Sequence, residues 1–405
     1  MFIGIDARLY GPRHAGIGRY TMELVKNLER IDSVNQYVIF LQRDNFDAYQ
    51  PSGSNFRKVL ADYRAYGWQE QLLFPFLLRQ YKFDFVHFTH FNVPLFYRRK
   101  FIATIHDLII SHYPSSRSTT LNPLIYNIKL FFYRLIVKST ARRAVRIIAV
   151  TDYTKNDIVK FLDVPDKKIT TVYEGVDLPP TSSGGWEILD RLGISGDFLL
   201  YVGSAYPHKN LEKLIDAYYL VGKKYPFLQL VLVGKNNFFY ERLKEFVAKE
   251  SVAVKNGLKD YPVGFKANNK ILDVEGTKET QPAGSVIKRI IFSGYLNDQD
   301  LVAVYQAAKL YVFPSLIEGF GLPPLEAQSY GIPVVSSNAT CLPEVLGDSV
   351  VYFNPHSAED MAEKILSVLD SDDLRRQLIA KGTENVKRYS WEKMGREILE
   401  NYKKI

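Results

Sequence analysis

Short apolar runs alternate with amphipathic stretches along the whole chain. Most of these runs are almost free of polar residues, which is typical of parallel strands buried on both faces. Strands are predicted at Phe2–Asp6, Tyr37–Leu41, Phe85–Phe88, Ile102–Ile105, Ile147–Val150 and Ile169–Val172, and again at Leu199–Val202, Leu228–Val233, Ile290–Ser293, Leu310–Phe313, Val334–Ser336 and Val350–Phe353. Helical patterns fall between them, for example at Ile17–Leu28, Leu211–Val221 and Leu301–Ala308. This alternation predicts an α/β protein with two doubly wound, Rossmann-like parallel sheets of about six strands each.

Two segments interrupt the alternation. Residues 178–197 begin with prolines, serines and glycines, the composition of a linker, so we place an N-terminal domain at residues 1-180 and a C-terminal domain at residues 196-387. Residues 251-288 are rich in Lys, Gly and Asn without clear periodicity, and we interpret them as an inserted loop. Beyond the second domain, Trp391–Tyr402 has the spacing of an amphipathic helix.

The composition narrows the class of protein. The 405 residues are 46% hydrophobic and 24% charged, an ordinary globular mixture. The single cysteine, Cys341, excludes an internal disulfide framework and any cysteine-built metal site. No apolar run reaches the ~18 residues of a spanning helix, and the sequence after Met1 lacks the features of a signal peptide, so we expect a cytoplasmic protein.

The formal charge of +8 is unevenly distributed. Residues 1–180 hold 25 Lys and Arg against 16 Asp and Glu, whereas residues 181–405 hold 27 against 28. This asymmetry indicates two domains with different partners. Charge alone admits nucleic acid, an anionic membrane or a phosphorylated small molecule as partner.

The strongest chemical feature follows the predicted strand that ends at Phe313. A glycine-containing loop leads into a helix that begins near Leu322, so the loop lies at the carboxyl end of a parallel strand, where ligands usually bind. The backbone amides of Gly319, Phe320, Gly321 and Leu322, at the N-terminus of that helix, can attract an anion.

Two glutamates bracket this anion site. Glu318 in the loop can accept hydrogen bonds from hydroxyls or position a cation, and Glu326 in the helix can accept them from vicinal hydroxyls. The alternative is an ordinary turn residue and a solvated helix residue, but the strand–loop–helix context favours the binding role.

A second strand–loop–helix junction lies at residues 201–210. Lys209 near the start of its helix can meet a diphosphate as a point charge, and Asn210 is the expected N-cap. The alternative is an ordinary surface lysine before a capped helix.

The first strand is followed by a turn of small residues. Gly16 and Gly18 would let the backbone approach a ligand, but the third glycine of the dinucleotide-binding pattern is missing, so a tight turn before a helix is the alternative. Arg8, Arg13 and Arg19 would face phosphates or solvent.

Histidines follow two other predicted strands. His106 at a strand end could donate to a bound group, with Asp107 orienting it or capping the following segment, although a purely structural pair is the alternative. His87 and His90 are three residues apart, but no third metal ligand is evident. The acidic pair at residues 298–300 is explained by helix capping, so no metal site is expected.

The stretch 124-146 mixes Leu, Ile and Phe with Lys and Arg. A basic helix that carries aromatic residues can lie on an anionic membrane surface. It can equally be a packed crossover helix with a solvated basic end.

Together these motifs resemble the retaining glycosyltransferases of family 4, which have the GT-B fold. The likeness rests on the segment Glu-Gly-Phe-Gly-Leu-Pro-Pro-Leu-Glu that holds both glutamates, and on Gly16–Tyr20, His106-Asp107, Glu174–Asp177 and Ser337–Glu344. A Gly-x-x-x-Pro-x-Lys-Asn loop makes the subgroup of bacterial mannosyltransferases of surface-polysaccharide synthesis the most similar. The resemblance implies two domains facing across a cleft, with a C-terminal helix, residues 388-405, that packs back on the N-terminal domain.

The resemblance also implies a role for each matching residue. The donor diphosphate would be bound by Lys209 and by amides of Gly16, Gly321 and Leu322; the donor sugar by Glu318 and amides of Gly319 and Phe320; the ribose by Glu326. His106 would lie beside the reacting centre.

The remaining assignments are less directly matched. Gly18, Ser204 and His208 would complete the donor side, and Arg13, Asp107 and His90 would lie on the acceptor side. Ser204 and His208 occupy positions where the family and the subgroup, respectively, often have an arginine, so part of the phosphate charge would be neutralised by another group.

We therefore expect a metal-independent transfer, with no bound cofactor, of mannose from GDP-mannose to a glycan or lipid-linked glycan acceptor, with retention at the anomeric carbon. The alternatives are a UDP-sugar-dependent enzyme of the same fold, a nucleotide-sugar 2-epimerase and a non-catalytic sugar- or lipid-binding relative. Nucleic acid is the least expected partner, because no nucleic-acid module accompanies the basic residues. Peripheral contact with the inner membrane face through 124-146 is an open expectation.

Overall fold

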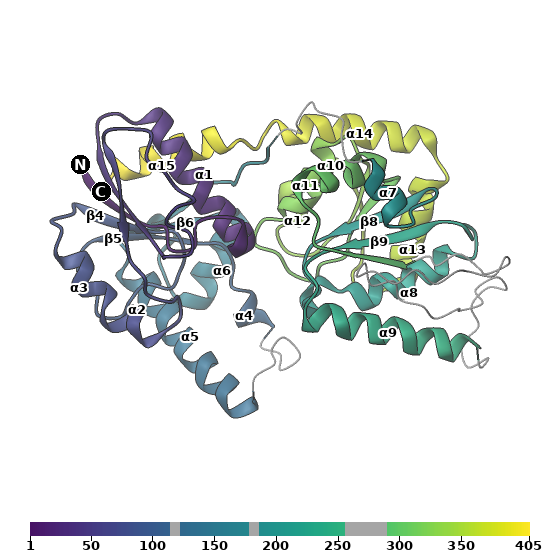
Figure 1. Ribbon diagram of the computed structural model, residues 1–405, viewed down its shortest axis with the longest axis horizontal. Helices are drawn as coiled ribbons and strands as arrows, with labels where there is room; N and C mark the ends of the chain where they lie inside the picture. The colour runs from purple at the N-terminus through teal and green to yellow at the C-terminus, as the bar shows by residue number, and fades with distance from the viewer. Residues whose placement is uncertain (114–121, 178–185, 256–289) are drawn as a thin grey trace. The chain divides into compact units, whose positions relative to one another are not determined.

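The chain divides into two compact units (Figure 1). Unit 1 comprises residues 1–176 and 389–405, and unit 2 comprises residues 177–388. The computed structural model describes residues 1–113, 122–177, 186–255 and 290–405. The start of the predicted linker, at 178–185, and most of the predicted insertion, at 256–288, lie outside the described residues.

Unit 1 is built on a seven-stranded parallel sheet in the order β3-β2-β1-β4-β5-β6-β7. Its strands are β1 (Phe2–Asp6), β2 (Gln36–Leu41), β3 (Phe56–Leu60), β4 (Phe85–Phe88), β5 (Phe101–Ile105), β6 (Arg146–Ala149) and β7 (Ile169–Thr171). The strand order reverses between β1 and β4, so the loops that follow these two strands meet at the carboxyl edge of the sheet, where doubly wound folds bind ligands.

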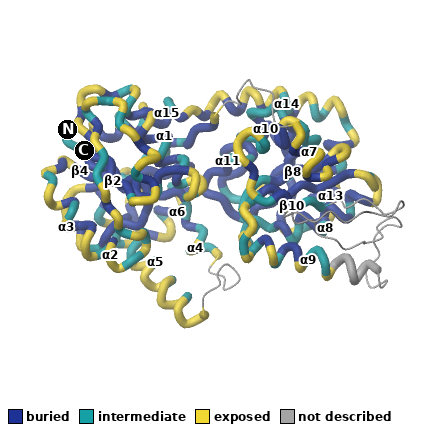
Figure 2. The backbone as a smooth tube through the Cα atoms, viewed as in Figure 1, coloured by how far each residue is buried: buried dark blue, intermediate teal, exposed yellow. Residues whose placement is uncertain are grey.

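The helices of unit 1 follow these strands. They are α1 (Ala15–Ile31), α2 (Trp68–Leu72), α3 (Phe74–Arg79), α4 (Ile109–His112), α5 (Pro123–Arg143), α6 (Asp152–Leu162) and α15 (Trp391–Tyr402), with 3-10 turns η1 (Pro12–His14) and η3 (Asp166–Lys168). The central strands β1, β4, β5 and β6 are largely buried, whereas much of α5 is exposed (Figure 2).

The edge strand β3 is a finding that sequence analysis missed. Arg57 and Lys58 interrupt its apolar residues, so it lacks the continuous pattern of a central strand. An edge strand has one free side in the sheet, and charged residues are tolerated and even useful there because they discourage pairing with other chains.

Unit 2 has a six-stranded parallel sheet in the order β10-β9-β8-β11-β12-β13, the same topology without the seventh strand. Its strands are β8 (Phe198–Val202), β9 (Gln229–Val233), β10 (Ile290–Gly294), β11 (Leu310–Phe313), β12 (Val334–Ser337) and β13 (Val351–Phe353). The switch in strand order lies between β8 and β11.

The helices of unit 2 are α7 (Glu187–Arg191), α8 (Leu211–Val221), α9 (Phe238–Lys255), α10 (Asp298–Ala307), α11 (Leu322–Ser329), α12 (Leu342–Leu346), α13 (Ala358–Leu369) and α14 (Asp372–Val386), with the 3-10 turn η4 (Pro207–Lys209). The predicted insertion was placed too early, because α9 continues through residues 251–255.

The C-terminal helix α15 belongs to unit 1, as the family resemblance implies, and packs on α1. Its buried residues include Trp391, Met394, Ile398 and Tyr402, the four that define the amphipathic pattern in the sequence. The Tyr402 hydroxyl lies 2.6 Å from Nδ1 of His87 in β4, which ties the end of the chain to the centre of the sheet.

Candidate active site

The loops that follow β8 and β11 are joined by contacts within unit 2. Lys209 Nζ lies 2.6 Å from Oε1 of Glu318, and both side chains are largely buried. The backbone N–H of Leu316 donates to the carbonyl of His208 at 2.8 Å. The topology explains this meeting, because β8 and β11 are neighbours at the switch in strand order. Two motifs found separately in the sequence therefore form one cluster.

The loop around Glu318 is held by the segment before α12. The backbone N–H of Glu318 donates to the hydroxyl of Thr340 at 3.1 Å. The thiol of Cys341 donates to the carbonyls of Glu318 and Phe320, and burial raises its pKa far above the ordinary range of a thiol. Cys341 is thus a neutral structural donor that fixes the shape of the loop.

Helix α11 starts at the end of this loop. Gly321 is its N-cap residue and has φ 95°, a left-handed conformation that favours glycine. A Cβ atom on Gly321 would lie 2.9 Å from Cδ2 of Leu342, so the position is also sterically restricted. Helix α11 therefore starts four residues after Glu318. Of its first three residues only Leu322 has a backbone N–H that could face an anion, because Pro323 and Pro324 follow it.

Glu326 lies on α11 and is partly buried. The hydroxyl of Tyr305, in α10, donates to Glu326 Oε2 at 3.3 Å. Tyr305 itself stacks on Tyr330, with ring centroids 4.9 Å apart. Glu326 is thus a positioned acceptor rather than a freely rotating surface residue.

Ser204 and His208 occupy the two positions where related proteins often have an arginine. Burial, together with the charge of Lys209, lowers the pKa of His208 to about 4, so its ring is neutral near pH 7 and does not replace an arginine charge. The carbonyl of Ser204 accepts from the hydroxyl of Tyr201 at 2.8 Å. In this part of the cluster the positive charge therefore comes from Lys209.

Asn210 occupies the predicted N-cap position of α8, with φ 61°, but its side chain makes no capping hydrogen bond. Its Nδ2 donates instead to the carbonyls of Pro314 and Pro355 at 3.1 and 2.7 Å. Asn210 therefore ties the β8 loop to the β11 loop and to the segment after β13.

The two glycines of the β1 loop differ in their surroundings. A Cβ atom on Gly18 would lie 2.0 Å from the carbonyl oxygen of Gly11, whereas a Cβ on Gly16 would have no atom within 4 Å. Close packing accounts for Gly18, and open space at Gly16 is compatible with a ligand. Arg13 is exposed and lies 3.6 Å from Asp44.

His106 at the end of β5 is buried and bonded at both ring nitrogens. Nδ1 lies 3.0 Å from Glu174 Oε1, and Nε2 lies 2.9 Å from the carbonyl of Thr89. A carboxylate and a carbonyl both accept hydrogen bonds, so this pair of partners favours a proton on each ring nitrogen. Burial alone lowers the pKa of His106, but the hydrogen bond and charge of Glu174 outweigh it and the pKa lies above its ordinary value.

His106 has no ring N–H left to donate to a ligand while it keeps these partners, which differs from the donor role expected of it. Asp107 Oδ1 accepts from the backbone N–H of Ile109 at 2.9 Å, so Asp107 caps the following segment, one of the two roles that the sequence left open. Sequence analysis used Glu174 only as part of a family motif and missed it as the partner of His106.

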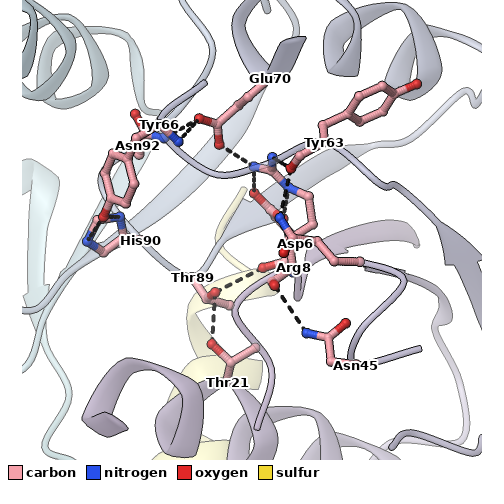
Figure 3. Close-up of polar contacts among 11 residues, drawn as sticks. Asp6, Arg8, Thr21, Asn45, Tyr63, Tyr66, Glu70, Thr89, His90 and Asn92 are labelled. Atoms are coloured by element: carbon pink, nitrogen blue, oxygen red, sulfur yellow. Dashed lines mark hydrogen bonds and ion pairs between the residues drawn. The ribbon is translucent and has the colours of Figure 1, made fainter. Parts of the chain in front are cut away.

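Arg8 faces neither phosphate nor solvent. It is buried, with Nη2 2.7 Å from Asp6 and 2.6 Å from Glu70 (Figure 3). Its guanidinium also lies over the ring of Phe74, 4.1 Å from the ring centroid. The paired carboxylates raise its pKa despite the opposing effect of burial. The positive charge of Arg8 is therefore neutralised by carboxylates of the same unit.

His90, the histidine assigned to the acceptor side, also lies in unit 1. Its ring is 3.2 Å from the Tyr66 hydroxyl through Nδ1, and burial together with the charges of His106 and Arg8 lowers its pKa to about 3. Among the described residues no group of three or more His, Cys, Asp or Glu side chains is arranged to hold a metal ion.

Comparisons with known proteins agree with this architecture. The family model described as Glycosyltransferase Family 4 matches residues 14–179, and that described as Glycosyl transferases group 1 matches residues 282–385. The chain is a family 4 glycosyltransferase. The two matches fall in different units, one around the β1 loop and His106 and the other around both glutamates.

Its curated relatives include proteins named as mannosyltransferases. The glycosyltransferase is 28% identical to O-antigen chain mannosyltransferase B of Escherichia coli over 96% of both chains. It is 23% identical to O-antigen chain mannosyltransferase RfbU of Salmonella typhimurium over 76% of this chain and 69% of the relative.

Solved structures establish the fold of the glycosyltransferase. Anabaena Alr3699/HepE, solved with UDP-glucose, superposes with a TM-score of 0.69 at 16% identity and covers 100% of both chains. WaaG, a glycosyltransferase involved in lipopolysaccharide biosynthesis, gives 0.68 at 14% identity over 98% of both. The fold is GT-B, as the sequence motifs imply.

Proposed function

We propose that this glycosyltransferase moves mannose from GDP-mannose, with retention of anomeric configuration, to a glycan or lipid-linked glycan acceptor in surface-polysaccharide synthesis. The observation that carries the proposal is the Lys209–Glu318 pair, at 2.6 Å, next to the start of α11. Mannose as the sugar is supported by the names of two relatives, one of them matched over 96% of both chains.

The cluster offers complementary partners to each part of a nucleotide-sugar. Lys209 and the backbone amides of Gly321 and Leu322 would meet the diphosphate, whose negative charge increases as the bond to the sugar breaks. Glu318 would exchange its contact with Lys209 for sugar hydroxyls. Glu326, already oriented by Tyr305, would accept hydrogen bonds from the ribose.

The proposed transfer balances without a metal ion or cofactor. The bond from the anomeric carbon to the β-phosphate oxygen breaks and a bond to an acceptor oxygen forms on the same face. The acceptor proton passes to the departing phosphate, and GDP leaves. Charge stabilisation from Lys209 and α11 acts where the leaving group forms.

The decisive experiment measures donor binding and turnover in the full chain. Isothermal titration with GDP, UDP and ADP should select GDP, and Lys209→Ala and Glu326→Ala should each weaken GDP binding at least tenfold. Lys213→Ala, in α8 and paired with Asp216 at 3.6 Å, is the matched control that should bind normally. Wild-type binding and turnover in both site variants would refute the assignment.

Three further outcomes separate the alternatives. Tighter binding of UDP than of GDP would replace GDP-mannose by a UDP-sugar. Release of nucleotide diphosphate from the donor without any acceptor would favour the 2-epimerase reaction. Proton NMR of the product settles retention, since an inverted anomeric signal would overturn that part of the proposal.

We also propose that the enzyme works on the inner membrane face through α5. Leu124 and Phe131 are 74% and 64% exposed, and Ile128 and Phe132 are at least half exposed. The sequence of α5 contains five Lys and Arg and no acidic residue. An apolar and basic helix surface fits an anionic bilayer. Among the described residues, no helix combines the length and apolar character required to cross a bilayer.

Vesicle co-sedimentation tests this surface. The protein should bind vesicles that contain phosphatidylglycerol and not pure phosphatidylcholine vesicles, and the double variant Phe131→Ser, Phe132→Ser should lose at least tenfold in affinity. Phe96→Ser, at another exposed phenylalanine of unit 1, is the control. Equal binding to both vesicle types would contradict the proposal.

A further inference from the structure

A line of hydrogen-bonded side chains crosses the interior of unit 1 from the last helix of the chain to α1. The hydroxyl of Tyr402 in α15 lies 2.6 Å from Nδ1 of His87 in β4. Nε2 of His87 lies 2.9 Å from the hydroxyl of Thr104 in β5, which lies 2.9 Å from the hydroxyl of Tyr20 in α1. All four side chains are completely buried. The family resemblance gives none of them a role in the transfer.

The two distances at His87 indicate where its proton lies. Burial, together with the charge of His106, lowers the pKa of His87 to about 3, so near pH 7 the ring is neutral and only one nitrogen carries a proton. Hydrogen bonds from an O–H donor are typically about 2.7–2.8 Å long, and those from an N–H donor about 2.9–3.0 Å. The short contact at Nδ1 therefore has Tyr402 as its donor, and the proton of His87 is on Nε2, which donates to Thr104.

The remaining donors of the line point the same way. The hydroxyl of Thr104 accepts from His87, so its own proton is directed to the hydroxyl oxygen of Tyr20. Hydrogen bonds aligned in one direction in a buried network polarise one another and hold their members more firmly than separate bonds would. Without the hydroxyl of Tyr402, Nδ1 of His87 would have no donor, and the opposite tautomer of His87 would become accessible.

Tyr20 is the point at which this line reaches the candidate site. Its ring lies edge-on to the ring of His106, with centroids 4.7 Å apart. Thr104 precedes His106 by two residues at the end of β5, so Tyr20 contacts both side chains at once. Fixing the hydroxyl of Tyr20 at Thr104 therefore fixes the ring that packs against His106.

The next residue of α1 fastens the helix on the opposite side of His106. The hydroxyls of Thr21 and Thr89 lie 3.0 Å apart. The carbonyl of Thr89 is the group that accepts from Nε2 of His106, at 2.9 Å. Two successive residues of α1 thus restrain His106, one through its ring and one through its hydrogen-bond partner.

We infer that Tyr402 is a positioning residue for the transfer, acting on His106 through His87, Thr104 and Tyr20. The inference rests on the proposed transferase function and adds a remote hydroxyl, in the last helix of the chain, on which the geometry beside the reacting centre depends. A displaced group beside a reacting centre slows the chemical step, whereas the Lys209 cluster that would bind GDP lies in the other unit.

The first test is kinetic and uses the full chain. Tyr402→Phe keeps the ring that packs on Phe85, with centroids 5.1 Å apart, and removes only the hydroxyl. It should lower kcat for GDP release from GDP-mannose, with α-mannotriose as acceptor, about tenfold and leave GDP affinity within twofold. The matched control is Tyr49→Phe, which removes another buried tyrosine hydroxyl bonded to α1, at Glu29, and should keep the wild-type kcat.

The second test reads the two histidines directly and needs no turnover. In nitrogen-15 NMR of histidine-labelled protein, the wild type should show His87 neutral with its proton on Nε2. Tyr402→Phe should move the ring signals of His87 towards the other tautomer and shift those of His106 as well. Tyr49→Phe should leave both sets of signals in place.

A double-variant cycle separates a connected line from two independent contacts. Tyr20→Phe keeps the ring beside His106 and breaks the line at its far end, so it should also lower kcat about tenfold. Because both changes interrupt the same line, Tyr402→Phe combined with Tyr20→Phe should be no slower than the slower single variant. Losses that multiply would show that the two tyrosines act separately and would refute the line.

The other results also decide the inference. A wild-type kcat in Tyr402→Phe, or His106 signals that do not move, would overturn it. A loss of GDP affinity as large as the loss of kcat would show a general loss of structure and would overturn it too. A wild type that neither binds GDP nor releases it from GDP-mannose would instead count against the proposed function, and the His106 signals would then decide the positioning role alone.

Discussion

The two glycines of the β1 loop give the sharpest test of the distinction between packing and binding. The Cβ of Gly18→Ala would lie 2.0 Å from the carbonyl oxygen of Gly11 and 2.9 Å from that of Leu9. The first distance is about 1.4 Å short of an ordinary contact, and both neighbours are backbone atoms that cannot rotate away. The same turn also holds the hydrogen bond from Gly11 N–H to the Gly18 carbonyl, at 3.2 Å.

The magnitude follows from two opposing effects. Overpacking costs about 1–3 kcal/mol, and the gain from alanine in a helix recovers only about 0.5–1 kcal/mol. With a shift of roughly 2–4 °C per kcal/mol for a unit of this size, Gly18→Ala should lower Tm by several degrees. Gly16→Ala, which adds its methyl group to open space in α1, should keep or slightly raise Tm.

Differential scanning calorimetry and GDP titration measure both properties. We expect Gly18→Ala to lose stability, and Gly16→Ala to keep its stability but bind GDP about tenfold more weakly, because the methyl group fills the approach to the backbone amide. A wild-type Tm for Gly18→Ala would refute the packing argument. Normal GDP affinity in Gly16→Ala would remove that glycine from the donor site.

Three further perturbations test other parts of the structure. Burial lowers the pKa of both His87 and His90 to about 3, so below about pH 6.5 the unfolded chain binds protons that the folded chain does not. The free energy of unfolding should therefore fall by up to ~1.4 kcal/mol per pH unit per histidine as the pH is lowered from 6.5 to 5, and the urea midpoint should fall with it. A urea midpoint that does not change over this range would contradict the argument. Gly175→Ala places Cβ 2.2 Å from the first backbone nitrogen of α15, so limited proteolysis should release the C-terminus faster than from wild type, and equal rates would exclude the clash. Tyr305→Phe removes a hydrogen bond to Glu326 and should weaken GDP binding about three- to tenfold at unchanged Tm, as titration would show; an unchanged affinity would mean that Glu326 needs no support.

The sequence was most informative where local pattern and chemistry coincide. Continuous apolar runs predicted twelve of the strands because parallel strands are buried on both faces, while β3 escaped because Arg57 and Lys58 lie at an edge. Strand–loop–helix junctions predicted the loops of Lys209 and Glu318. Their contact follows from strand order, which periodicity alone does not specify.

Long-range partners were the part that sequence could not supply. Glu174 is 68 residues from His106 and Glu70 is 62 residues from Arg8, and nothing local marks either carboxylate as a partner. The same applies to neutral His208, whose pKa depends on burial that the sequence does not reveal. The sequence predicted which side chains lie in the candidate site. It could not predict the charge of a side chain such as His208, or whether a side chain such as His106 is free to bind a ligand, because both depend on neighbours that are distant in the sequence.

The positive charge of the first 180 residues is partly neutralised inside the unit and partly displayed on α5. Arg8 is neutralised by Asp6 and Glu70, whereas α5 has five basic residues, no acidic ones and a row of exposed apolar side chains. A lipid-linked acceptor would be presented at an anionic bilayer, which α5 would match in both charge and apolar surface. Since salt screens exposed charges but does not weaken the burial of apolar side chains, raising salt from 50 to 500 mM should weaken binding of the wild type to anionic vesicles severalfold and leave part of the binding in place. Vesicle binding that does not change with salt would show that the basic residues of α5 do not contribute.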